Sequence, residues 1–140
     1  MTTRRESIVA AQKVALAAAF GGATIWRGRA APLSRGEFPA VILEKVKDVP
    51  SEEFNTKTEH MLTVRVAVLV RSETPDQTSD PMEALVHSTM TATPTWGGLA
   101  IDTMVGNVDW ELLDTDVTTG LASMLFHIHY RTSQTDISVP

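Results

Sequence analysis

The sequence contains no cysteine among its 140 residues. This absence excludes disulfide bonds, thiolate zinc sites and a cysteine nucleophile together. Long apolar runs are also absent, because no stretch approaches the roughly 18 residues that a membrane helix needs. The apolar run that follows the first arginines is interrupted by Gln12 and Lys13. We therefore expect neither a secretory signal nor a membrane segment.

Positive charge is scarce relative to negative charge. Twelve lysines and arginines stand against 17 aspartates and glutamates, for a net charge of -5. Such a chain repels phosphate backbones, so nucleic acid is not an expected partner. The length fits one core, and we predict a single domain over residues 1–131 followed by a flexible polar tail at 132–140.

The sequence also lacks the known signatures of enzyme sites. It has no nucleophile elbow, no phosphate-binding glycine loop, no dinucleotide fingerprint and no metalloprotease helix. Gly97 and Gly98 follow Trp96 without the further glycine and lysine of a phosphate loop, and they indicate a turn. We accordingly expect no catalytic activity, no resident metal and no cofactor.

A first helix is predicted over residues 3–20, where alanine and leucine dominate and Gly21 ends the run. At the helical period one broad face holds Ile8, Ala11, Val14, Ala15 and Ala18, and the opposite face holds Arg5, Gln12 and Lys13. Val9, Leu16 and Phe20 fall among the polar positions. They either contact another subunit or widen the stripe that faces the core, and the pattern leaves both interpretations open.

The remaining chain predicts five strands and a second helix. Strict alternation marks residues 59–71 and 120–131, while residues 49–58 are polar and predict an exposed loop. Asp80, Pro81 and Glu83 match a helix start with a capping box, and Pro94 ends that helix. The other predicted segments are strands at 24–29, 40–46 and 99–113, with a bulge at Gly106 and Asn107, and a loop at 30–39. The order predicts an α+β fold, with one mainly antiparallel twisted sheet of about five strands and two helices packed against it.

Two histidines allow an alternative hypothesis. His127 and His129 are two residues apart on a strand, so they point the same way and could hold one metal. A third ligand is needed, and His60 supplies it only if its strand neighbours theirs in the right register. This reading corresponds to a small metal-dependent enzyme.

Charge is unevenly distributed along the chain. The first third carries Arg4, Arg5, Arg27, Arg29 and Arg35. An acidic cluster near the last turn consists of Asp109, Glu111, Asp114 and Asp116. Opposite charges at two ends of a subunit suit head-to-tail contacts in a ring, although scattered surface charge explains the pattern as well.

Several sequence segments, together with this order of elements, resemble those of the tail terminator proteins of long-tailed bacteriophages, the family of the lambda-type minor tail protein U. The segments are RRESIVAA from Arg4, APLSRGEFPAVIL from Ala31, HMLTVRVAVLV from His60, GGLAID from Gly97 and HIHYRT from His127. They span nearly the whole chain, and none is a catalytic motif.

The resemblance implies a virion protein of the phage or prophage tail, present in the host cytoplasm during assembly. It implies a ring, a hexamer on the tail, that caps the tail tube and offers the joining surface for the head. The implied partners are other copies of the chain, the tail tube protein and head-tail connector proteins. Loops at 31–37 and 49–58 are the expected contact loops. The candidate subunit or tube contacts are Val9, Leu16, Phe20, Arg27, Arg29, Arg35, Glu37, Glu52 and Glu53.

Other readings stay open at this level. A head completion or neck protein would share the ring architecture and the lack of chemistry. An unrelated bacterial adaptor domain would also fit the composition.

Overall fold

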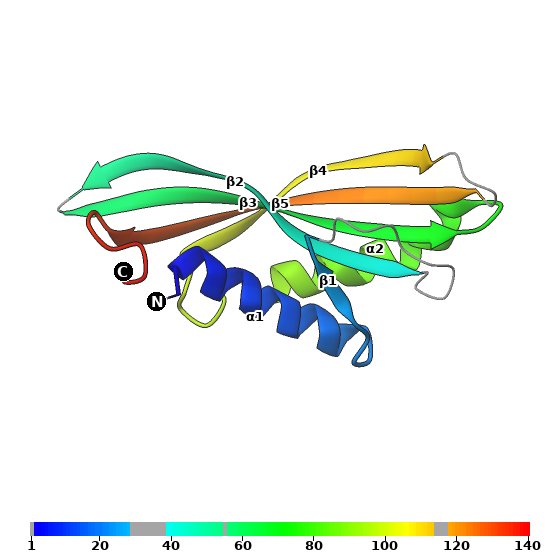
Figure 1. The fold of residues 1–140 in the computed structure, drawn as a ribbon, viewed down its shortest axis with the longest axis horizontal. Helices are drawn as coiled ribbons and strands as arrows, with labels where there is room; N and C mark the ends of the chain where they lie inside the picture. The colour runs from blue at the N-terminus through cyan, green and yellow to red at the C-terminus, as the bar shows by residue number, and fades with distance from the viewer. Residues whose placement is uncertain (1, 29–38, 55, 114–117) are drawn as a thin grey trace.

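The computed structural model describes residues 2–28, 39–54, 56–113 and 118–140. It has the predicted α+β architecture, an open five-stranded sheet with both helices on one face (Figure 1). We call the other side of the sheet the open face. In chain order the elements are α1 (Arg4–Ala19), β1 (Ile25–Arg27), β2 (Ala40–Phe54), β3 (Lys57–Arg71), α2 (Pro75–Ala92), β4 (Asp102–Leu113) and β5 (Thr119–Ser133).

The strands lie in the order β1-β2-β3-β5-β4. Only β1 and β2 pair in parallel, and the other three pairs are antiparallel. The sheet is long and strongly twisted, so the molecule is elongated (Figure 1). β1 and β4 are the two edge strands, and β1 covers only Val41–Leu43 of its neighbour.

The core lies between the helices and the inner face of the sheet. On β3 the predicted alternation is confirmed, because His60 and every second residue up to Val70 are buried. On β5 the residues from Ala122 to Tyr130 alternate in the same way. α2 contributes Val86 and Met90 to this core.

The burial of α1 differs from the helical-wheel prediction. Ile8, Val9, Gln12 and Leu16 are buried, whereas Val14 is largely exposed. The reason is that α1 packs against both the sheet and α2, so its buried stripe is rotated toward Val9 and Leu16. The side-chain amide of Gln12 is enclosed with no hydrogen-bond partner in the described part of the chain.

α2 begins six residues earlier than the capping pattern at Asp80 predicted. Its first residue is Pro75, which satisfies the same preference for proline in the first turn. Pro81 therefore lies inside the helix, and Glu83 is buried against the sheet instead of closing a capping box. Residues 75–79, which the capping pattern at Asp80 places before the helix, are therefore helical.

The predicted loop at 49–58 was also wrong. β2 continues to Phe54 and β3 starts at Lys57, so these residues form the tip of a long hairpin. Figure 1 shows this hairpin extending beyond the end of α1. Its polar residues remain exposed because neither helix covers a face of the tip. A strand that is polar on both faces has the composition of a loop, so the sequence predicted a loop here.

The last residues, for which the sequence predicts a flexible tail, fold back onto the body. β5 continues to Ser133, the amide of Gln134 donates to the carbonyl of Thr56, and the amide of Arg4 donates to the carbonyl of Ile137. The first and last residues consequently lie side by side (Figure 1). Among the described residues, neither helix has the length and hydrophobicity needed to cross a membrane.

Candidate interaction surface

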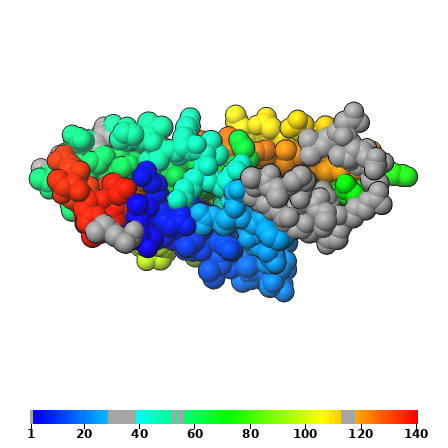
Figure 2. Space-filling view, in the orientation of Figure 1, coloured from blue at the N-terminus to red at the C-terminus, as the bar shows by residue number. Residues whose placement is uncertain are grey.

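β4 is an edge strand with exposed apolar side chains on both of its faces. Met104 and Val105 are 42% and 46% exposed, and Trp110 and Leu112 are 60% and 70% exposed. Figure 2 shows β4, in yellow, along the rim of the molecule. A free edge of this kind presents unpaired backbone groups beside apolar surface, and soluble proteins normally protect such edges. We call the outer side of β4 the β4 edge.

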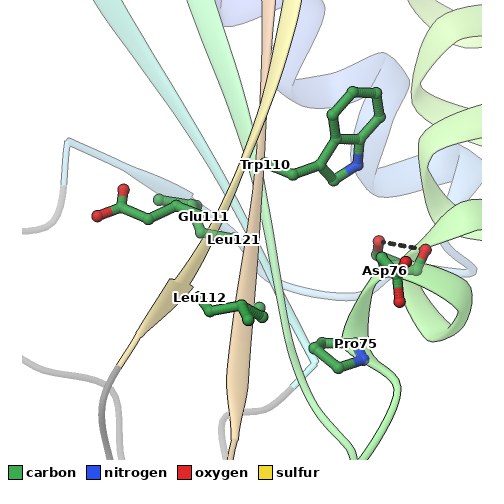
Figure 3. Close-up of a pocket in the computed structure, with 8 residues that line it drawn as sticks. Pro75, Asp76, Trp110, Glu111, Leu112 and Leu121 are labelled. Atoms are coloured by element: carbon green, nitrogen blue, oxygen red, sulfur yellow. Dashed lines mark hydrogen bonds between the residues drawn. The ribbon is translucent and has the colours of Figure 1, made fainter.

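A groove of about 310 Å³ runs between the β4 edge and the start of α2. Its walls include Pro75, Asp76 and Ser79 from α2, and Trp110 and Leu112 from β4. In Figure 3 the indole of Trp110 and the side chain of Leu112 point toward α2, while Glu111 points to the other side of the sheet. The groove thus combines two exposed apolar side chains with polar groups of the first turns of α2.

Glu83 fixes the orientation of Trp110. The indole Nε1–H donates to Glu83 Oε1 at 3.1 Å, and the Ser79 hydroxyl donates to Glu83 Oε2 at 2.6 Å. Glu83 is only 7% exposed, so these bonds supply the stabilisation that water would otherwise give its carboxylate. The tryptophan is therefore held in place although most of its surface is free.

A close backbone approach holds α2 against the sheet at this groove. A Cβ added to Gly120 of β5 would lie 2.4 Å from Cβ of Pro75. No residue larger than glycine fits there without displacing the first turn of α2. The glycine thereby sets the width of the groove.

The opposite edge of the sheet is covered at one corner. β1 covers residues 41–43 of β2, and Glu6 of α1 holds this corner by pairing with Arg27 at 3.1 Å and with Lys45 at 2.5 Å. These two cations lower the pKa of Glu6 to about 2. Further along, β2 has Pro50 and a register irregularity between Pro50 and Glu52, both of which hinder the addition of a strand. Another irregularity lies between Lys45 and Lys47.

Between the residues paired with β1 and Pro50, no described strand covers residues 45–49 of β2, which we call the β2 window. Val46 and Val49 in this window are 42% and 47% exposed. Lys47 is exposed as well and has no ion-pair partner among the described residues.

Val9 and Leu16, predicted as subunit contacts, are completely buried in the core of the subunit. The structure therefore assigns them to the alternative, a wide core-facing stripe, because α1 packs on two elements at once. Phe20 is partly buried against the same core. Arg27 lies at the β1 corner and is paired with Glu6.

The remaining predicted contacts lie in the hairpin and in the first long loop. Glu53 is exposed near the tip of the β2–β3 hairpin, opposite Thr58. Glu52 lies in β2 opposite Glu59, and its side chain is outside the described set. Arg29, Arg35 and Glu37 lie outside the described residues, as do the predicted contact loop at 31–37 and the acidic residues Asp114 and Asp116.

The three histidines of the metal hypothesis do not converge. His127 bonds to Thr63 and His129 to Glu59 on the open face, whereas His60 stacks on Tyr130 on the helix-covered face. The described residues contain no group of three or more histidines and carboxylates arranged to hold a metal ion. Hydrogen bonds from Arg131 and His129 lower the pKa of Glu59, so this carboxylate serves as an acceptor on the sheet surface.

A polar cluster that the sequence did not predict joins α1 to the hairpin. Asp48 accepts hydrogen bonds from Arg5 at 3.0 Å and from the hydroxyl of Tyr130, and it lies 3.2 Å from the ring of His60. Burial and the adjacent carboxylate raise the pKa of Tyr130, so its hydroxyl stays protonated. The cluster connects elements of the same subunit, which favours a structural role.

The sequence did not predict the β4 edge, because the acidic residues and the apolar residues of this strand were interpreted separately. Asp109 and Glu111 of the predicted acidic cluster are exposed on the open face. Trp110 and Leu112 alternate with them and are exposed on the helix-covered side. The available signal was that apolar residues occupy both alternating positions of this strand, Met104 on one side and Val105 on the other.

Comparison with known proteins gives limited similarity. No protein-family model matches the chain. No curated protein matches it either. Among solved structures, the chain is similar to one described as "Virion of native gene transfer agent (GTA) particle", with a TM-score of 0.48 and 10% sequence identity, over 88% of this chain and 91% of that one. A likeness at this level carries no conclusion about function.

Proposed function

We propose that this chain is a virion assembly protein without catalytic activity, a tail terminator that forms a ring on the tail tube. In this role copies of the chain close around the end of the tube, stop its growth and provide the surface for head attachment. The ring is a hexamer on the tail. The protein acts in the host cytoplasm during assembly and remains in the tail of the finished particle.

The observation that carries the proposal is the β4 edge. Twelve residues of edge strand carry exposed Met104, Val105, Trp110 and Leu112, and an apolar edge of this kind can pair with another chain. A protein whose work is to fit against copies of itself needs such a surface. The segments that resemble tail terminators, among them GGLAID immediately before and into β4, narrow this assembly role to the end of the tail.

The rest of the described surface supports contact better than chemistry. The histidines lie on opposite faces of the sheet, and the buried polar cluster around Asp48 links α1 to the hairpin of its own subunit. The groove beside Trp110 is lined by the apolar side chains of Pro75, Trp110 and Leu112 and by the polar side chains of Asp76 and Ser79. This lining suits the side chain of a neighbouring protein.

The test is electron microscopy of particles assembled without this chain. Overlong tails or tails without heads are expected, and supplying the protein in trans should restore joined particles of normal length. Tails of normal length that merely lack heads would instead indicate a neck protein. Normal, joined particles would refute an assembly role at the tail end.

A further inference from the structure

The two free edges of the sheet expose apolar side chains at the same height along the strands. Met104 of β4 pairs with His127 of β5, which pairs with Thr63 of β3, which pairs with Lys47 of β2. Met104 and Lys47 therefore lie at the same level across the sheet. In the same way Asp102 is level with Val49. The first segment of β4 and the β2 window are therefore matching parts of opposite edges.

The strand directions allow these parts to pair between copies. β2 and β3, β3 and β5, and β5 and β4 are each antiparallel, so β4 runs opposite to β2. A second copy placed beside the first in the same orientation brings its β2 next to the first copy's β4. The junction is then antiparallel, like the other long pairings of the sheet.

The apolar side chains of the two segments are alike in exposure, and Val49 lies diagonally across from Met104 in the level alignment. Met104 and Val105 on one side, and Val46 and Val49 on the other, are all between 42% and 47% exposed. Each edge buries these side chains when the other covers it, and backbone hydrogen bonds add to the contact. The window on β2 is bounded by β1 on one side and Pro50 on the other, which limits the pairing to one stretch.

Charge favours this head-to-tail pairing over pairing of two β4 strands. The charged residues of β4 are Asp102, Asp109 and Glu111, and all are acidic. Two β4 strands side by side would therefore bring only like charges together. Lys47 of the β2 window has no ion-pair partner among the described residues and lies diagonally across from Asp102 in the level alignment.

We propose that residues 102–105 of β4 in one copy pair antiparallel with the β2 window, residues 45–49, of the next copy. The contact is heterologous, so repeating it closes a ring or extends a chain of copies. This proposal adds the contact surface to the ring-forming function proposed above. It rests on that function for the number of copies in the closed ring. It names the surface and its occupant, a second copy of this chain.

The absence of native cysteine allows a direct test by disulfide trapping. The double variant Met104→Cys with Lys47→Cys places one thiol on each edge. β2 and β4 are separated by β3 and β5, so these positions lie about 14 Å apart within a subunit, at about 4.8 Å per strand spacing. A disulfide needs Cα atoms within about 7 Å, which excludes a bond inside one copy.

The expected result is a ladder of linked species beyond the dimer in non-reducing electrophoresis, because each copy is linked at both edges. Single variants should give no ladder. A matched control, Met104→Cys with Ala84→Cys on the exposed side of α2, should behave like the single variant. The variants Asp102→Cys with Val49→Cys test the neighbouring level of the same register.

Oxidation is performed both on the concentrated purified protein and on assembled particles, so that a ring formed only on the tube is also sampled. Absence of the ladder for both double variants in both samples would overturn the proposal. Efficient dimers of the single Met104→Cys variant would overturn it too, since they would show β4 paired with β4. If the double variants give the ladder but particles assembled without the protein are normal, the contact between copies is upheld and the terminator function is refuted.

Discussion

The two edges of the sheet differ in how far they are protected. The β2 edge has a covering strand, two register irregularities and Pro50, and its corner is held by Glu6 between Arg27 and Lys45. The β4 edge has one irregularity, and it exposes large apolar side chains on both faces. The sheet thus offers one long exposed edge on β4 and one short open window on β2, and the two edges are not equivalent.

The difference also concerns rigidity. The β4 edge is supported from below by α2, through the contact of Pro75 with Gly120 and through the hydrogen bond from Trp110 to Glu83. The β2 edge is supported by ion pairs at its corner. A rigid exposed edge is better suited to binding because little conformational entropy is lost on contact.

The largest expected effect follows from charging the β4 edge. Replacing Met104 and Val105 with lysine should abolish self-association and joined particles, because an added strand would bury both charges. Both side chains are already about half exposed, so the free energy of unfolding should change by no more than ~0.5 kcal/mol per site. Light scattering, particle titre and thermal melting measure the three quantities.

Ala84→Lys on the exposed side of α2 is the control for added charge, and it should assemble normally. Normal assembly of the Met104 and Val105 variant would show that the β4 edge is not a contact. Loss of folding in that variant would be visible in the melting curve before any assembly result is interpreted.

Gly120→Ala tests the support beneath the β4 edge. The added methyl would meet Pro75, so α2 or β5 must shift, and we expect a destabilisation of about 1–3 kcal/mol. Urea unfolding followed by circular dichroism measures this loss. Ser123→Ala on the same strand is the control and should stay within ~0.5 kcal/mol of the parent. Equal stability of the two variants would contradict the close packing.

Trp110→Phe removes the indole donor while keeping an aromatic ring in the groove. Glu83 then loses one of its two hydrogen bonds, and we expect a cost of about 1 kcal/mol in unfolding free energy. Leu112→Ala changes a side chain that is 70% exposed and should have a smaller effect. If the leucine variant were the less stable one, the hydrogen bond would not be what positions this edge.

Glu6→Gln tests the protected corner and should have the smallest effect, below ~1 kcal/mol at neutral pH, because the pair is partly exposed to solvent. The pKa of Glu6 is about 2 in the folded chain, below its ordinary value near 4.5. Its contribution is therefore fully present above about pH 4.5 and is lost as the pH falls toward 2. Urea unfolding at pH 7 and pH 3 should show the difference between parent and variant shrinking, and a constant difference would argue against the ion pairs.

Much of the fold could be predicted from local pattern. The alternation of β3, the helical composition of α1 and the bulge near Gly106 all have short-range causes, and the structure confirms them. Elements that depend on distant partners were less predictable. The hairpin tip at 49–58 is polar because it is exposed on both faces, and such a segment has the composition of a loop.

The errors on the helices have a similar origin. Pro75 and Pro81 both fit the first turn of a helix, and in the structure the earlier one begins the helix, where Pro75 packs against Gly120. The burial of Gln12 in place of Val14 depends on how α1 meets α2. The exposure of Trp110 depends on strand order, because the same residues in a central strand would be buried. Candidate contacts could therefore not be assigned from periodicity alone.

The irregularity in β4 also restricts how far any assembly can spread along this strand. Gly106 and Asn107 together lie opposite the interval between Phe126 and Met124, so the strand has one more residue here than its partner. A regular partner in step with Met104 would be out of step at Trp110. Contacts along β4 are thereby restricted to the residues on one side of the irregularity.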